Sequence, residues 1–203
     1  MARLKASPDA IRGVYERQAA AYDAQRSRAL FEARWLARFA ARLPAGGRVL
    51  DLGCGAGEPI ARWFIAEGFD VTGVDFSTAM LEIARARWPD GDWREADMRT
   101  LDLGETFDGL IAWDSFFHLS PRDQRACIAR MAGHLAPNGS LLLTVGPEAG
   151  EAQGTVGGEP VYHASLSPAG YAACLEENGL RLTGFLADDP ETDRHSVLMA
   201  RKT

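Results

Sequence analysis

The sequence predicts an α/β fold in which a mostly parallel sheet is covered by helices on both faces. Short apolar runs alternate with helical stretches between residues 45 and 145, which is the order expected of a parallel sheet. Most of the runs are rich in apolar residues, as in strands buried on both faces. A length of 203 residues with 46% hydrophobic content suits a single domain with one core.

Residues 1–44 are expected to form two helices. Ser7 followed by Pro8 is typical of a helix start, because proline is favoured at the first helical position. The second helix is indicated by apolar residues at helical spacing, which continue until Pro44: Leu30, Trp35, Leu36, Phe39 and Leu43.

Residues 45–145 contain five expected strands with helical stretches between them. The strand-like runs are RVLDL (48–52), FDVTGVD (69–75), DWREAD (92–97), FDGLIAW (107–113) and SLLLTV (140–145). The helical stretches are 58–68, 77–88 and 121–139, and the last of them ends in a proline, an asparagine and a glycine, which together signal a stop and a turn.

The region after residue 145 departs from this alternation. Residues 146–167 are rich in glycine and lack clear periodicity, so we expect a long loop, which in a compact domain is usually functional or mobile. Residues 168–203 predict a closing helix and two closing strands. The whole chain, 1–203, is therefore interpreted as a single domain.

Charge is unevenly distributed along the chain. Residues 1–50 carry ten Lys and Arg against four acidic residues, a net charge of +6. Because the whole chain has a net charge of −6, the remaining residues carry a net charge of −12. A basic arm can bind nucleic acid, but helix faces that pack on an acidic body give the same pattern. We favour the second interpretation, because the acidic body would repel a polyanion.

Cysteine spacing and hydropathy indicate which kinds of site and which compartment to expect. The three cysteines match neither a zinc site nor a disulfide framework, so we expect reduced thiols and no metal. No apolar run is long enough for a membrane span, and the N-terminus lacks the apolar region of a signal peptide. The expected compartment is the cytoplasm, with no membrane partner.

The stretch VLDLGCGAGEP (49–59) is a glycine-rich turn between an expected strand and helix, where backbone N–H groups can meet a ligand. A dinucleotide fingerprint needs its third glycine three places after the second, and Glu58 stands there instead. No lysine follows, which excludes a Walker-type phosphate loop. The acid before the glycines, Asp51, better suits a ligand that carries an ammonium group.

Asp51, Gly53, Gly55 and Gly57 resemble the first motif of class I S-adenosylmethionine-dependent methyltransferases, acid-x-Gly-x-Gly-x-Gly. The resemblance implies a Rossmann-like fold with a seven-stranded, mostly parallel sheet and an antiparallel last strand. It implies S-adenosylmethionine as cofactor, S-adenosylhomocysteine as product, and a cofactor-binding core over 45–145. Cys54 is interpreted as a small residue within this cofactor-binding loop.

The resemblance continues along the chain in the family's order. Asp75 matches the acid that holds both ribose hydroxyls, with Phe76 against the adenine and Ser77 beside it. Asp97 matches the residue that holds the adenine amino group, and the Met98 N–H is available to a ring nitrogen. Helix capping for Asp75 and a solvated loop acid for Asp97 are the alternatives. Together these residues lie at strand ends, where ligands of open α/β sheets bind.

The segment IAWDSFFHLSP (111–121) is expected to face both cofactor and acceptor. Trp113 is assigned to the cofactor site, and Asp114 is a candidate to orient a substrate amine. His118 is the first candidate for a general base, needed only if the nucleophile carries a proton. The alternatives are helix capping for Asp114 and a packed core histidine for His118.

Residues on either side of this core complete the expected site. Tyr15 and Tyr22 lie seven apart on one helix face, and in small-molecule members of the family such a helix (1–44) folds over the cofactor. Arg26 would then meet the methionine carboxylate. The tyrosines could equally form a core stripe. From the acceptor-side loop, 146–167, Tyr162 and His163 are offered to an acceptor, together with Glu159.

The expected reaction is in-line methyl transfer to a small-molecule acceptor walled by aromatic residues: Trp113, Phe116, Phe117 and Tyr162. Sequence signatures of the adenine, glutamine and cytosine-5 methyltransferases and the Lys-Asp-Lys-Glu set are absent. A nucleic-acid methyltransferase that uses the basic N-terminal segment, and an NAD-binding oxidoreductase, stay open as alternatives. The acceptor atom and the oligomeric state do not follow from the sequence.

Overall fold

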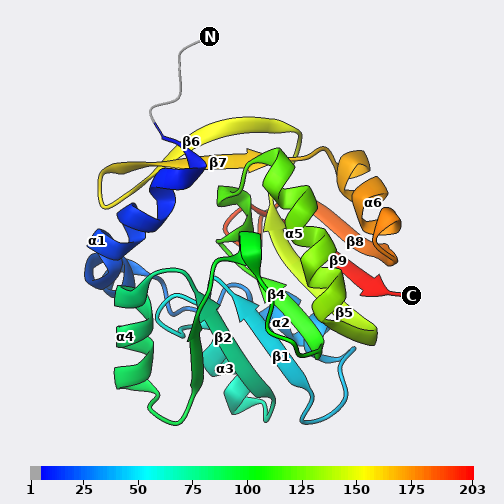
Figure 1. The fold of residues 1–203 in the computed structure, drawn as a ribbon, viewed down its shortest axis with the longest axis horizontal. Coiled ribbons are helices and arrows are strands. Elements are labelled where there is room, and N and C mark those ends of the chain that lie inside the picture. The colour runs from blue at the N-terminus through cyan, green and yellow to red at the C-terminus, as the bar shows by residue number, and fades with distance from the viewer. Residues whose placement is uncertain (1–5) are drawn as a thin grey trace.

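The computed structural model describes residues 6–203 (Figure 1), so Arg3 and Lys5 of the basic segment lie outside the described residues. Its centre is a seven-stranded sheet in the order β3-β2-β1-β4-β5-β9-β8. The strands are β1 Arg48–Leu52, β2 Asp70–Asp75, β3 Asp92–Glu95, β4 Phe107–Ala112, β5 Leu135–Val145, β8 Leu180–Asp189 and β9 His195–Lys202. Strands β1 to β5 pair in parallel, and β9 runs antiparallel between β5 and β8. The predicted sheet, including its antiparallel last strand, is confirmed.

Helices cover both faces of the sheet. Helices α5 (Pro121–His134) and α6 (Pro168–Glu177) lie on the face nearer the viewer in Figure 1, and α2 (Ala33–Ala40), α3 (Ile60–Ala66) and α4 (Thr78–Arg87) contribute to the core on the other face. Strand residues alternate between the two cores: Leu50 and Leu52 pack with α5 and α6, and Val49 packs with α2 and α3. Because both faces are buried, both sets of side chains are apolar, which produces the apolar runs in the sequence.

Helix α1 (Ile11–Gln25) packs outside the sheet, on α4 and on a two-stranded hairpin. A short 3-10 turn, Pro8–Ala10, precedes it, and the Ser7 side chain makes no capping bond there. Ile11 and Val14 of α1 share a small third core with Val161 and Ala164 of the hairpin. Figure 1 shows α1 and the hairpin together over one end of the sheet.

The prediction of a long loop over 146–167 is wrong, because this segment forms a hairpin of β6 (Gly150–Val156) and β7 (Glu159–Ser165). Gly157 and Gly158 connect the strands, with φ of 57° and 81°. Two positive φ values are what a tight hairpin turn requires, and glycine adopts them without steric cost. Most of β6 is exposed, so it lacks the apolar alternation that would have marked it as a strand.

The basic N-terminal segment is largely neutralised within the molecule. Most of its described basic side chains pair with acidic groups, many of them from the rest of the domain: Arg12 with Glu95, Arg17 with Glu159, Arg26 with Glu32 and Asp114, Arg28 with Asp23 and Glu58, Arg34 with Asp189 and Glu191, and Arg48 with Asp70 and Glu105. This supports the interpretation in which basic helix faces pack on an acidic body.

The remaining expectations concern cysteines and membranes. Cys54, Cys127 and Cys174 are free thiols, and all three are buried. Within residues 6–203, no helix combines the length and the apolarity needed to cross a bilayer.

Candidate active site

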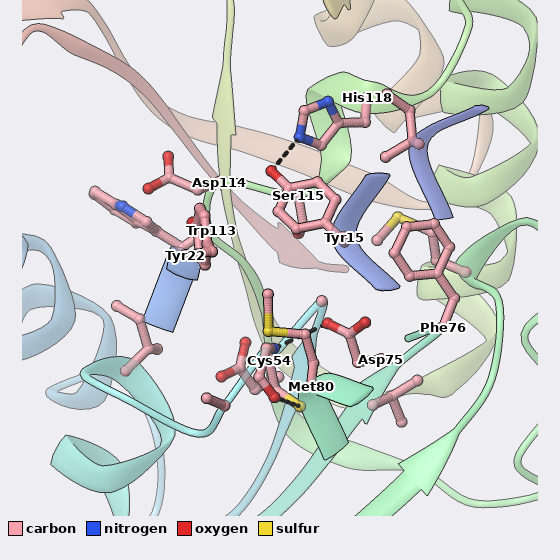
Figure 2. A pocket seen from close by; sticks show the side chains of 18 of the residues that line it. Tyr15, Tyr22, Cys54, Asp75, Phe76, Met80, Trp113, Asp114, Ser115 and His118 are labelled. Carbon is pink, nitrogen blue, oxygen red and sulfur yellow. Dashed lines mark hydrogen bonds between the residues drawn. The ribbon is translucent and has the colours of Figure 1, made fainter. Parts of the chain in front are cut away.

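A cavity lies at the carboxyl ends of β1, β2 and β4, covered by α1 (Figure 2). It encloses about 1040 Å³ of empty space, its open mouth included, which is ample for a small molecule. The predicted residues that line it are Tyr15, Tyr22, Arg26, Asp51, Gly53, Cys54, Gly55, Asp75, Phe76, Asp97, Met98, Trp113, Asp114 and His118. The predicted residues that are not among its lining are Gly57, Ser77, Phe116, Phe117, Glu159, Tyr162 and His163. The predicted aromatic wall is therefore wrong for Phe116, which is fully buried in the core with residues of α5 and α6.

The glycine loop forms the floor of the cavity together with Asp75. The Gly55 N–H donates to Asp75 Oδ2 at 2.9 Å, and the Ser77 N–H donates to Asp75 Oδ1 at 2.8 Å. Gly53 has a φ of 78°, and a Cβ there would lie 2.3 Å from the Ser115 Cβ. Only glycine fits at this position. The loop therefore holds the Asp75 carboxylate in a fixed orientation, and Ser77 caps α4 instead of lining the cavity.

Two buried acids on the cavity floor, Asp51 and Asp75, have raised pKa values. Burial raises the pKa of Asp51 to about 7, and the nearby Asp75 carboxylate adds to this effect. Burial also raises the pKa of Asp75 to about 6, although hydrogen bonds from Ser77 and Gly55 oppose it. Within residues 6–203, no cation is among the groups that shift the pKa of either acid. A cationic ligand in the cavity would favour their ionised forms.

Asp97 stands at the end of β3, beside a cation that sequence reasoning missed. Its carboxylate accepts hydrogen bonds from the Arg99 N–H at 2.9 Å and from the Arg99 guanidinium at 2.6 Å. Burial would raise the pKa of Asp97, but the bonds from Arg99 outweigh burial and lower it. Arg99 also pairs with Asp9 of the N-terminal turn at 2.9 Å. Asp97 therefore stays ionised, and a carboxylate keeps acceptor sites beyond those that Arg99 uses.

His118 connects helix α1 to the hairpin. Its Nε2 lies 2.9 Å from the Tyr15 hydroxyl (Figure 2), and its Nδ1 lies 2.8 Å from the carbonyl oxygen of Tyr162. A carbonyl only accepts, so Nδ1 carries the hydrogen. Burial lowers the pKa of His118 to about 4, so the ring is neutral and Nε2 accepts from Tyr15. His118 thus presents a basic nitrogen to a hydroxyl that lines the cavity.

The hairpin supports His118 from behind. Tyr162 contributes its backbone carbonyl, and its side chain is buried in the third core. The His163 ring packs 4.8 Å from the Phe117 ring and 5.0 Å from the His118 ring. Glu159 accepts hydrogen bonds from Arg17 and Gln18 of α1. The hairpin residues predicted to contact an acceptor therefore fix the surroundings of His118 and α1.

Asp114 follows β4 and faces two cations. Its Oδ1 lies 2.7 Å from His195 Nε2, and its Oδ2 lies 3.5 Å from Arg26. Arg26 pairs in turn with Glu32, whose side chain is fully buried. His195 was not predicted, because it begins β9 and no motif surrounds it. The pairing of Val145 with Ser196 brings the start of this antiparallel strand to the edge where the parallel strands end.

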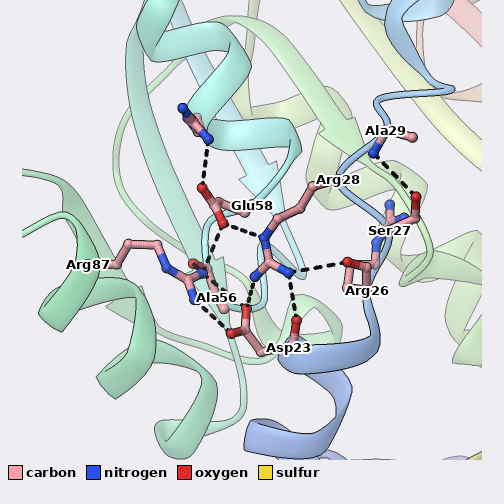
Figure 3. Close-up of polar contacts among 9 residues, drawn as sticks. Asp23, Arg26, Ser27, Arg28, Ala29, Ala56, Glu58 and Arg87 are labelled. Carbon is pink, nitrogen blue, oxygen red and sulfur yellow. Dashed lines mark hydrogen bonds and ion pairs between the residues drawn. The ribbon is translucent and has the colours of Figure 1, made fainter.

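Glu58, which the sequence suggested would repel a pyrophosphate, belongs to a cluster of ion pairs (Figure 3). It pairs with Arg28 at 2.7 Å, Arg62 at 3.1 Å and Arg87 at 3.4 Å. Asp23 of α1 joins the same cluster through Arg28 and Arg87. Because three cations compensate its charge, Glu58 is a weaker barrier to phosphate than the sequence suggested.

Residues 49–139 match the family model described as "Methyltransferase domain". The match and the curated relatives make this chain similar to class I S-adenosylmethionine-dependent methyltransferases. One similar protein is a dTDP-4-amino-2,3,4,6-tetradeoxy-D-glucose N,N-dimethyltransferase of Saccharopolyspora spinosa, 39% identical over 50% of this chain and 41% of its own length. Another is the 27-O-demethylrifamycin SV methyltransferase of Amycolatopsis mediterranei (strain S699), 36% identical over 70% of this chain and 58% of its own.

Solved structures of methyltransferases share the fold. CalS10, an amino pentose methyltransferase from Micromonospora echinaspora, was solved with S-adenosylmethionine bound and aligns with a TM-score of 0.71 and 23% identity over 92% of this chain and 96% of its own. CcbJ from Streptomyces caelestis aligns with a TM-score of 0.74 and 22% identity over 94% and 98% of the two chains. At these identities the likeness shows the fold alone. The chain spans about half the length of the curated relatives it matches.

Proposed function

We propose that the protein transfers a methyl group from S-adenosylmethionine to a small-molecule acceptor. The observation that carries this proposal is the cavity in which the glycine loop, Asp51 and Asp75 meet under the tyrosines of α1. When bound, S-adenosylmethionine supplies an electrophilic methyl group on a sulfonium. The chemistry of the residues fits such a ligand, since two buried and uncompensated acids suit a molecule with cationic groups and ribose hydroxyls.

Each part of the cavity has a role in this proposal. Asp51 would pair with the ammonium group and Asp75 would accept hydrogen bonds from the ribose hydroxyls. Phe76 would pack on the adenine, and Asp97 would accept from its amino group. These roles follow the family resemblance and the position of all four residues along the cavity lining.

His118 and Tyr15 would handle the proton of the acceptor. Since the Tyr15 hydroxyl donates to His118 Nε2, its oxygen is free to accept from an N–H or O–H in the cavity. As the acceptor atom bonds to the methyl group, its proton would pass to the Tyr15 oxygen while the Tyr15 proton passes to His118. General bases of this kind contribute about 10² to 10⁴ in rate.

The acceptor class is proposed from the relatives. Several are named as N,N-dimethyltransferases of amino sugars, and others as O-methyltransferases. We propose a metabolite with an amine or hydroxyl nucleophile, handled in the cytoplasm. A nucleic-acid acceptor has less support, because the basic segment that would bind it is largely paired with acidic groups.

Calorimetric titration with S-adenosylhomocysteine, and with NADH as the comparison ligand, tests the proposal. We expect micromolar binding of the adenosyl ligand, weakened about 100-fold in Asp75→Asn, because two hydroxyl contacts to a charged group are lost. Asp70→Asn, at the exposed opposite end of β2, is the matched control and should bind as the wild type. Binding of NADH without the adenosyl ligand would favour the oxidoreductase.

A further inference from the structure

His195 makes contacts that fix its charge. Its Nδ1 lies 2.6 Å from the carbonyl oxygen of Thr192, and its Nε2 lies 2.7 Å from Asp114 Oδ1. A carbonyl oxygen and a carboxylate oxygen both accept, so both ring nitrogens donate. The ring is therefore an imidazolium.

Aromatic rings hold His195 against two other segments. Its ring lies 5.6 Å from the Phe31 ring at an interplanar angle of 28°, and 5.6 Å from the Trp113 ring at 30°. Phe31 belongs to the linker between α1 and α2, and the Arg26 guanidinium lies 5.4 Å from its ring. His195 thus connects β9 both to the linker between α1 and α2 and to Trp113 in the cavity wall.

Each segment that meets at His195 contains a residue in the left-handed backbone region. Leu30 has a φ of 52°, Asp114 of 55°, Asp193 of 50° and Arg194 of 60°. Non-glycine residues adopt this conformation at a cost and keep it where the surroundings hold them there. The junction at His195 is such a place, and residues held this way are concentrated at functional sites.

Four charges alternate through the junction in the order Glu32, Arg26, Asp114 and His195. Arg26 and Asp114 line the cavity, whereas Glu32 and His195 are not among its lining residues. With His195 charged, the four groups sum to zero. Without that charge they sum to −1, which would repel an anionic group at this wall and draw Arg26 onto Asp114.

We propose that His195 is a positioning residue: as a charged donor it holds the Asp114 carboxylate and, through Asp114, keeps Arg26 available for the carboxylate of the cofactor's methionine group. This rests on the proposed function. The charged groups that face His195 are Asp114 after β4, Asp193 before β9 and, through Asp114, Arg26 of the linker. Burial opposes the charge of the ring, but Asp114 outweighs burial and raises the pKa of His195 to about 9.

The test is titration of S-adenosylhomocysteine into the wild type, His195→Gln and His195→Phe. Phe keeps a flat ring for Phe31 and Trp113 but has no donor, and Gln keeps an N–H donor without charge. At about pH 7 we expect affinity to fall roughly threefold in the Gln variant and roughly tenfold in the Phe variant. Thermal unfolding of each variant checks that it folds.

The pH dependence separates positioning from packing. The pKa of His195 is raised on folding, so its charge is present below about pH 9 and is lost above it. At about pH 10 the wild type should therefore approach the Gln variant, and the Phe variant should remain weaker. Ratios between variants cancel the ionisation of the ligand itself.

Two outcomes would overturn the inference, and they differ. Wild-type affinity of the Phe variant at neutral pH would show that the ring only packs, and a ratio of Gln variant to wild type that is the same at both pH values would show that the charge of the ring has no part in binding. Failure of the wild type to bind the ligand at all would overturn the proposed function and this inference with it.

Discussion

His118 and His195 are bonded to side chains that line the same cavity, yet their surroundings give them opposite charges. His118 meets the Tyr15 hydroxyl and a carbonyl, and burial lowers its pKa to about 4. His195 is also largely buried, but Asp114 overcomes burial and raises its pKa to about 9. The hydrogen bond to a carboxylate thus holds His195 as a cation, whereas His118, bonded to a hydroxyl and a carbonyl, stays neutral.

The largest expected effect is the loss of kcat when His118 is replaced. His118→Asn should lower kcat about 10² to 10⁴-fold, because it removes the base that takes the Tyr15 proton as Tyr15 receives the proton of the acceptor. Affinity for S-adenosylhomocysteine should stay near that of the wild type. The measurement is kcat with an acceptor found by screening for S-adenosylhomocysteine release. A variant that loses affinity and keeps its kcat would contradict the assignment.

A smaller effect is expected at Tyr15. Tyr15→Phe removes the hydroxyl between cavity and His118 but keeps the ring that packs edge-to-face 5.3 Å from Tyr22. We expect kcat to fall about 10²-fold, the lower end of the range for His118, because the hydroxyl that first receives the acceptor's proton is lost. Tyr22→Phe is the matched control, since no bond joins the Tyr22 hydroxyl to His118. Equal losses in the two variants would place the proton's route elsewhere.

The smallest expected effect concerns Asp51 on the cavity floor, whose ionisation should change when the ligand binds. The pKa of Asp51 is about 7 without ligand, and pairing with an ammonium group would lower it. Binding at about pH 6 should then release up to one proton from Asp51, and this titration alone should raise affinity by less than about tenfold between pH 6 and pH 7. Calorimetry in buffers of different ionisation enthalpy measures the protons, and Asp51→Asn should release fewer.

The sequence indicated the parts of the site that follow strand ends within a recognisable motif. Asp51, Asp75 and Asp97 all reach the cavity, because parallel strands end at one edge of the sheet. The exposed strand β6 carries no alternation, so the hairpin was missed. Tyr162 supports His118 with its backbone, which residue type does not reveal.

His195 shows why the rest of the site was out of reach. It stands 81 residues from its partner Asp114, on a strand whose pairing partner is known only from the sheet order. An antiparallel last strand was predicted, and this would have placed its first residue at the ligand-binding edge. What could not be predicted is the set of side chains around the ring, and these determine its charge.

The most direct test of the account is the protonation of the histidine rings, observed in a nitrogen-15 NMR titration of the wild type. The chain has four histidines, and His118→Asn and His195→Gln assign the two signals. The account predicts that His195 carries hydrogen on both nitrogens up to about pH 9, and that His118 is neutral, with hydrogen on Nδ1, down to about pH 4. Titration of both rings near the ordinary value of about 6.5 would contradict it.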